Sequence, residues 1–114
     1  MSEDHKSTNN MNKNQIFDLI VDKCASVCTV EAADIKGGSH QADVVDARCI
    51  AFCVAVCECG FTPRDIASLL GRKKTTNVRA LMQTYDNRCK SFCFRQLCAG
   101  MHAELPAIKK LIEG

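Results

Sequence analysis

The sequence lacks any apolar run that approaches the roughly 20 residues needed to cross a membrane. Its beginning, MSEDHKSTNNMNKNQ, is polar and has no apolar core of a signal peptide. A glycine-rich phosphate loop is also missing, which excludes an ATPase of that type and predicts no bound nucleotide. These absences lead us to expect a cytoplasmic protein that contacts no membrane.

A recognisable set of catalytic side chains is missing as well. The three histidines, His5, His40 and His102, lie far apart in polar or terminal segments. No Ser/His/Asp or Cys/His spacing indicates a nucleophile with its base. We therefore expect no enzyme activity, no catalytic residues and no cofactor.

The length and composition of the sequence suffice for one domain with a modest hydrophobic core. Its 114 residues are 46% hydrophobic and 25% charged, as in an ordinary globular protein. Apolar residues recur at helical spacing, and no strand pattern or internal repeat is present. The sequence predicts a single all-α domain in residues 14–114, after a disordered polar tail in residues 1–13.

The first three predicted helices have recognisable ends. The first follows the apolar positions of residues 14–28, and Thr29 is expected to cap a short second helix over residues 30–36. A long third helix begins near residue 43 with acidic residues in its first turn, where the helix dipole favours them. Gly60 is expected to be its C-cap.

The segment TPRD begins a fourth helix. Thr62 is expected to cap it, Pro63 to occupy its first turn, and Asp65 to complete a capping box. Gly71 is expected to end it after about two turns.

One long helix is then predicted from about residue 75 to residue 99, because apolar residues recur at helical spacing throughout. A break at Asp86 is the alternative. Gly100 is expected to end this helix, and a final short helix over residues 105–112 is entered through Pro106.

Cysteine is unusually frequent, and its spacing is four residues rather than the Cys-x-x-Cys common in zinc sites. That spacing stacks the sulfurs on one helix face, where reduced cysteine packs as a small hydrophobe. We expect buried structural thiols, with no disulfide framework and no bound metal. Metal or cluster binding is the alternative. The nine cysteines are Cys24, Cys28, Cys49, Cys53, Cys57, Cys59, Cys89, Cys93 and Cys98, and Cys57 with Cys59 would be the first metal candidates.

Charge is distributed unevenly along the chain. Residues 1–60 contain five Lys/Arg and nine Asp/Glu, a net charge of −4. Residues 61–95 contain eight Lys/Arg and two Asp/Glu, a net charge of +6. A basic segment suits a polyanionic partner, and a merely solvated surface is the alternative.

From about residue 14 to residue 85 the chain resembles a known family, the C-terminal DNA-binding domain of the bacterial replication initiator DnaA. That domain is a Trp-repressor-like helix-turn-helix. The resemblance is carried by IFDLIVDKCASVCTVEAADIKGG, DARCIAFCVAVCECG and TPRDIASLLGRKKTTNV. In the third segment the matching positions are Asp65, Ile66, Leu70, Gly71, Lys73, Thr76 and Val78, and Arg48 stands where the family has an Arg near the start of its long helix.

The chain departs from the family at its base-reading and phosphate-anchoring positions. Lys74, Thr75, Asn77 and Ala80 stand where the family has Asp, His, Thr and His. The family's basic loop before the long helix is here GGSHQADVVD, which is acidic, and the nucleotide-binding module is absent. The resemblance therefore implies the fold, but neither the origin-box specificity nor the initiator role.

The resemblance and the basic segment together predict binding of double-stranded DNA, either sequence-dependent or architectural, in the regulation of transcription or replication. In this motif the second helix enters the major groove while the first crosses the backbone. Lysines suit phosphates, whereas Asn77 can pair with adenine and Arg79 with guanine. The predicted DNA contacts are Arg48, Arg64, Arg72, Lys73, Lys74, Thr75, Thr76, Asn77 and Arg79; for each, a solvated polar side chain is the alternative.

Two other functions fit the sequence. A protein–protein interaction adaptor could keep the fold without binding DNA, and a metal or redox sensor could use the cysteines. The C-terminal helix carries Phe92, Phe94 and Leu97. These residues could pair two copies into a homodimer, because one small helix-turn-helix contacts few base pairs.

Overall fold

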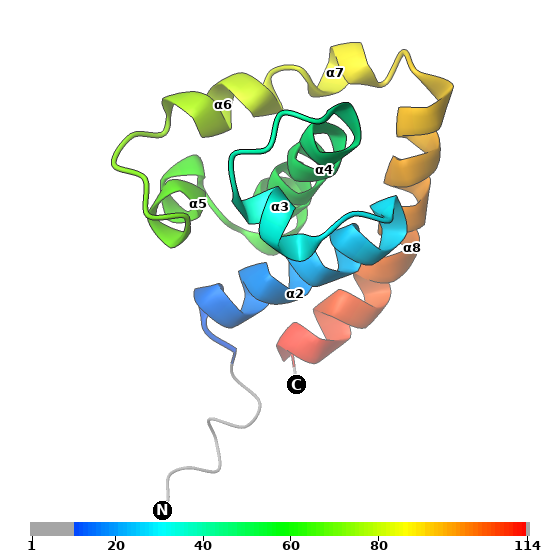
Figure 1. Ribbon diagram of the computed structural model, residues 1–114. Coiled ribbons are helices and arrows are strands. Elements are labelled where there is room, and N and C mark those ends of the chain that lie inside the picture. The colour runs from blue at the N-terminus through cyan, green and yellow to red at the C-terminus, as the bar shows by residue number, and fades with distance from the viewer. Residues whose placement is uncertain (1–10, 114) are drawn as a thin grey trace, which may run out of the picture.

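The computed structural model describes residues 11–113, and this part of the chain is all-α (Figure 1). The prediction of an all-α fold is confirmed. Most of the predicted tail, residues 1–10, lies outside the described residues, whereas Asn12 already caps the first helix. The helices are α2 (Lys13–Cys28), α3 (Ala32–Lys36), α4 (Ala42–Cys59), α5 (Pro63–Leu69), α6 (Thr76–Met82), α7 (Tyr85–Arg88) and α8 (Phe92–Glu113).

The central element is α4, which contacts each of the other described helices. Figure 1 shows them arranged around it, with α2 and α8 packed against each other along one side. The α4 side chains are buried on several faces. Phe17 of α2 packs near Phe52 of α4 and near Phe61, with ring centroids 6.4 and 6.1 Å apart. This core is the scaffold that carries α5 and α6.

The ends of α4 and α5 confirm the predictions made from their capping residues. Gly60 ends α4 in the left-handed region, with φ 77°. At the start of α5 the Thr62 hydroxyl accepts from the Asp65 amide at 3.1 Å, and the Asp65 carboxylate accepts from the Thr62 amide at 2.9 Å. Pro63 occupies the first turn, where its missing N–H costs no helical hydrogen bond. Gly71, with φ 71°, turns the chain after α5.

The predicted long helix from residue 75 to residue 99 is wrong. The α-helical hydrogen-bond pattern is interrupted at Gln83–Thr84 and again at residues 89–91, so three helices replace one. At the first break the Thr84 hydroxyl donates to the Leu81 carbonyl at 2.6 Å. In α7 the Arg88 guanidinium donates to Asp46 of α4 at 2.7 Å. The bond between Arg88 and Asp46 holds the chain against α4, so that it bends around the core instead of running straight past it.

The predicted helix end at Gly100 is also wrong, because α8 continues through Gly100 and Pro106. A Cβ on Gly100 would lie 2.9 Å from Val27 Cγ1, so this glycine allows α2 and α8 to approach closely. The buried side chains of Leu105 and Ile108 keep the helix on the core beyond that point. Their packing outweighs the hydrogen bond that Pro106 cannot donate.

A smaller correction concerns the start of α3. Thr29 does not cap α3, because it is the C-cap of α2 in the left-handed region, with φ 57°. Glu31 is the N-cap of α3 and makes no side-chain capping bond. Gly37 follows α3 directly, as expected. Between residues 11 and 113, no helix combines the length and the apolar character that crossing a membrane would require.

Candidate nucleic-acid interface

Two short helices, α5 and α6, contact each other and are both held on α4. Ile66 and Ala67 of α5 and Val78 of α6 are buried in the core. The chain turns tightly after α5, where the Gly71 amide donates to Ser68 at 3.0 Å and the Arg72 amide donates to Ala67 at 2.8 Å. Because both helices are anchored by buried side chains, the polar segment between them is presented outward.

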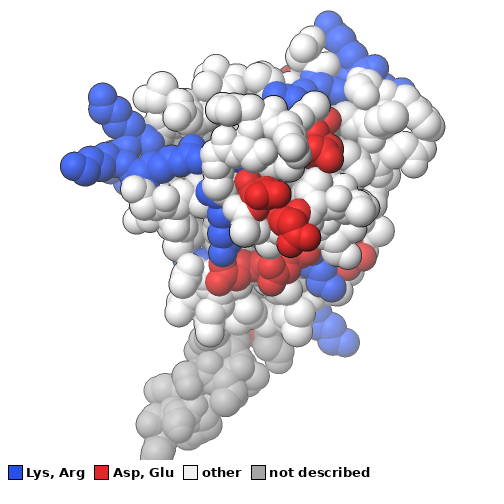
Figure 2. All heavy atoms as spheres, viewed as in Figure 1, with Lys and Arg blue, Asp and Glu red and all other residues white. Residues whose placement is uncertain are grey.

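This segment and the adjacent face of α5 line a hollow of about 630 Å³, which we call the basic concavity. Four of its side chains are cationic and none is acidic. Figure 2 shows Lys and Arg side chains projecting from this corner at the left of the view, apart from the Asp and Glu side chains near the centre. The lining residues are Arg64, Ala67, Ser68, Arg72, Lys73, Lys74, Thr75 and Thr76. The structure thus gathers six of the nine predicted DNA contacts.

The cations of the basic concavity are available to a partner. All ion pairs formed between described residues lie elsewhere on the molecule. The neighbouring carboxylate, Asp65, pairs with Lys13 at 2.6 Å. The hydrogen bond from Lys13 lowers the pKa of Asp65, and the Thr62 amide lowers it further. Asp65 is therefore engaged in the α5 cap and with α2, and no described carboxylate pairs with Arg64.

The side chains of α6 divide into a buried side and an exposed side. Val78 points into the core, whereas Thr76, Asn77 and Arg79 are exposed. The Arg79 Nε donates to the Thr75 hydroxyl at 3.0 Å, which orients the guanidinium toward the start of the helix. Asn77 and Arg79 are two positions apart, which is roughly 160° around a helix of 3.6 residues per turn. They therefore lie at opposite edges of the exposed side rather than together.

The middle of that exposed side holds a residue that the sequence analysis missed. Gln83 caps the C-terminus of α6, is exposed, and follows Thr76 by two turns. An amide side chain at this position can make the same paired hydrogen bonds to adenine as Asn. The sequence predicted Gln83 to lie inside a long helix, so nothing indicated that this residue ends α6. Ser68, which lines the basic concavity, was also missed.

Arg48 is not part of this surface, although it was predicted to contact DNA. Its side chain is buried, with 7% of the residue exposed. The guanidinium donates to the carbonyls of Ile35 at 2.7 Å, Asp34 at 2.8 Å and Ser39 at 3.0 Å. Burial lowers the pKa of Arg48, and the positive charge of Arg72 lowers it further. Arg48 therefore braces the connection between α3 and α4.

The cysteines divide by burial in a way that corrects part of the prediction. Cys57 and Cys93 are exposed, although all the cysteines were expected to be buried. The others are buried or half-buried, and all nine are free. Burial raises the pKa of Cys98, and the hydrogen bond with Cys28 together with burial raises that of Cys24. Among residues 11–113, no group of three or more His, Cys, Asp or Glu side chains could hold a metal ion.

The three side chains suggested for a homodimer do not share one surface. Phe94 is buried against Tyr85, with ring centroids 5.6 Å apart. Phe92 is 65% exposed, and the Arg95 guanidinium lies 5.8 Å from its ring centroid. Leu97 is half-buried.

Comparison of the chain with protein-family models, with curated proteins and with solved structures found no match.

Proposed function

We propose that α5 and α6 act as a helix-turn-helix and that the protein binds double-stranded DNA through the basic concavity and the exposed side of α6. The observation that carries the proposal is the gathering of Arg64, Arg72, Lys73 and Lys74 without a facing carboxylate. Four cations around one hollow, none of them ion-paired with another described residue, suit the regularly spaced phosphates of a duplex better than a solvated surface.

The arrangement of the two helices supports a docking mode. In a helix-turn-helix the second helix lies in the major groove and the first crosses the backbone. Here α6 would enter the groove, and the cations between α5 and α6 would contact the flanking phosphates. Thr76 and Gln83 would face the base edges, with Arg79 and Asn77 toward the two walls of the groove.

A single domain of this kind offers few base contacts and many phosphate contacts. Its affinity is therefore mostly electrostatic, and its sequence preference comes from a small number of side chains. We place the protein in the regulation of transcription or replication, either as a reader of a short site or as an architectural DNA-binding protein.

The experiment that tests the proposal measures the affinity for a random-sequence duplex at several salt concentrations. The logarithm of the association constant should fall linearly with the logarithm of the salt concentration, by roughly 0.9 per phosphate contact. The double variant Lys73→Ala with Lys74→Ala should flatten that slope by about 1.8, because two contacts are lost. Lys109→Ala with Lys110→Ala is the matched control, since this lysine pair lies on α8 and should leave the slope unchanged.

Absence of any affinity at low salt would reject the proposal and favour the protein–protein adaptor. Equal flattening by both double variants would also count against it, because the attraction would then come from overall charge rather than from this surface.

A further inference from the structure

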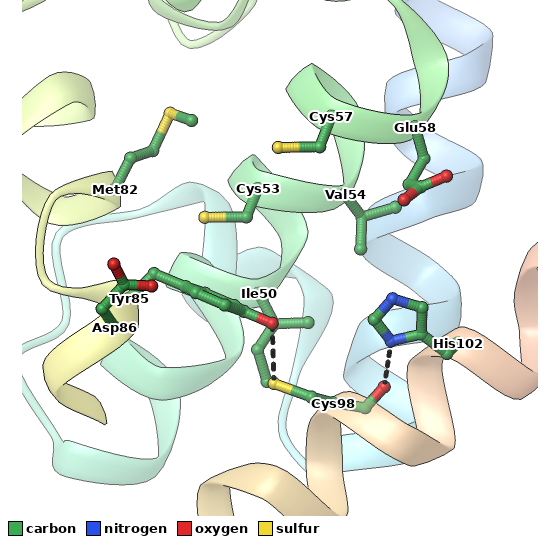
Figure 3. A pocket seen from close by; sticks show the side chains of 10 residues that line it. All are labelled: Ile50, Cys53, Val54, Cys57, Glu58, Met82, Tyr85, Asp86, Cys98 and His102. Carbon is green, nitrogen blue, oxygen red and sulfur yellow. Dashed lines mark hydrogen bonds between the residues drawn. The ribbon is translucent and has the colours of Figure 1, made fainter. Parts of the chain in front are cut away.

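A second hollow, with a volume of about 300 Å³, lies between α4, the α6–α7 region and α8. Its floor is formed by the buried side chains of Ile50, Val54 and Cys98. Figure 3 shows Met82 pointing from one side toward the thiols of Cys53 and Cys57, while the Tyr85 ring extends along the base. Such a size is at the small end of ligand pockets, and it suits a molecule with one or two rings.

The walls of this pocket favour an aromatic occupant. Thiols and a thioether are polarisable and contact aromatic rings favourably. The Tyr85 ring adds an aromatic surface, and its hydroxyl is already engaged as a donor to Cys98 Sγ at 3.5 Å. The interior therefore offers apolar and soft contacts but almost no free hydrogen-bond donor.

The rim favours a positively charged head group. Apart from the thiols and Tyr85, the ionisable side chains that line the pocket are Glu58, Asp86 and His102. No Lys or Arg side chain lines it. Lys109 pairs with Glu58 at 3.2 Å. Asp86 is exposed and forms no ion pair with another described residue. Asp86 is thus the carboxylate left to receive a cation.

His102 also presents an acceptor. Its Nδ1 lies 2.9 Å from the Cys98 carbonyl oxygen, which can accept but not donate (Figure 3). The proton of the neutral ring must therefore be on Nδ1, and Nε2 is left as an acceptor. A ligand rich in donors, such as an ammonium group, matches a rim that offers a carboxylate and an imidazole nitrogen.

We propose that this pocket binds a small aromatic amine. The ring would lie among Met82, Tyr85 and the thiols, and the ammonium would reach Asp86 or His102 at the rim. Because Met82 is the last residue of α6, an occupant would also touch the helix proposed to enter DNA. That consequence rests on the proposed function, whereas ligand binding itself does not.

The test uses three ligands of similar shape and different charge, titrated into the protein without DNA and followed by amide chemical shifts. They are phenethylamine, phenethyl alcohol and hydrocinnamate, which are cationic, neutral and anionic. The amine should bind most tightly and the acid least, with shifts centred on Val54, Met82 and Tyr85. Since no DNA is present, failure here is separate from failure of DNA binding.

Two substitutions locate the ligand. Asp86→Asn should weaken the amine by roughly twofold to fivefold and leave the alcohol unchanged, as for loss of one exposed ion pair. Asp22→Asn, an exposed carboxylate outside the pocket, is the control. Cys57→Phe should fill the mouth of the pocket and abolish binding, while Cys93→Phe, the same change at an exposed cysteine elsewhere, should not.

A second measurement does not depend on how the variants fold. Phenethylamine should slow iodoacetamide labelling of Cys57 in the wild-type protein without affecting Cys93. Equal affinity for the three ligands would overturn the assignment of an amine. No binding of any of them, or unaltered labelling of Cys57 at saturating amine, would overturn the assignment of the pocket as a ligand site.

Discussion

Replacing Arg48 separates a structural arginine from a DNA contact. The three hydrogen bonds from its guanidinium join α4 to the carbonyls of Asp34, Ile35 and Ser39. Each hydrogen bond to a charged group contributes about 1.5–3 kcal/mol to the free energy of unfolding. When the arginine side chain is removed, a carbonyl that water can reach bonds to water instead, and much of that contribution is recovered. The bond to Ile35 is buried, whereas the other two are partly buried. We expect Arg48→Ala to lower the free energy of unfolding by about 3 kcal/mol, mostly through the Ile35 carbonyl.

The assay is urea unfolding followed by far-UV circular dichroism, with two comparison variants. Arg48→Lys keeps the charge but cannot reach three carbonyls with one ammonium, so it should recover less than half of the loss. Arg64→Ala removes an exposed arginine and should change the free energy of unfolding by less than about 0.5 kcal/mol.

In DNA binding the two arginine variants should differ in the opposite way: Arg64→Ala should have an effect and Arg48→Ala should not. At temperatures well below its unfolding transition, Arg48→Ala should keep the wild-type salt dependence, because Arg48 is buried and lies outside the basic concavity. Arg64→Ala should flatten that dependence by about 0.9, the contribution of one phosphate contact. The reasoning is refuted if Arg48→Ala unfolds like the wild type and flattens the salt dependence instead.

Three further results are expected. Arg79→Ala should reduce the preference for one base, at one position of a site selected from a random library, by about 1–3 kcal/mol. Lys73→Ala should instead weaken binding to all duplexes alike. Equal losses of affinity on every duplex for Arg79→Ala would make Arg79 a phosphate contact. Thr62→Ala should lower the free energy of unfolding by about 1 kcal/mol in thermal or urea melts, because the capping box of α5 loses one of its two bonds, and an unchanged stability would contradict that role. Brief iodoacetamide treatment followed by peptide mass spectrometry should label Cys57 and Cys93 first, and rapid labelling of the buried thiols would contradict the packing given for Cys24, Cys49 and Cys98.

The features that the sequence predicted well are those decided by neighbouring residues. The α5 cap needs only Thr62, Pro63 and Asp65, which are close in the chain, and the structure forms both of its hydrogen bonds. Gly60 and Gly71 adopt positive φ beside helix ends, where glycine is favoured. The basic segment was likewise predicted, because Arg72, Lys73 and Lys74 are consecutive in the sequence, but the hollow that they line with Arg64 was not.

The features that the sequence did not predict depend on residues far apart in the chain. Nothing within residues 75–99 signals that Arg88 bonds to Asp46 or that the Cys49 thiol lies 3.5 Å from the Leu81 carbonyl. These contacts with α4 accompany the two breaks in what periodicity predicted as one helix. Gly100 was assigned to a helix end, although its role is to let α2 approach α8.

Arg48 and Gln83 show the same limit within the site. Arg48 was predicted to contact DNA because the resembled family has an Arg at this place in its long helix, but the carbonyls of Asp34 and Ile35 in α3 provide it with a buried position. Gln83 was overlooked because its place at the end of α6 is set by the break that follows. In both cases the local pattern indicated the residue's chemistry but not its surroundings.

The most direct test of the proposed DNA-binding surface is a nuclear magnetic resonance titration of the protein with a random-sequence duplex at low salt. The perturbed amides should cluster in residues 64–79 and at Gln83, and those of α2 and of the C-terminal half of α8 should stay unchanged. Perturbations centred on α2 and α3, or no perturbation at all, would contradict the proposal that α5, α6 and the basic concavity bind DNA.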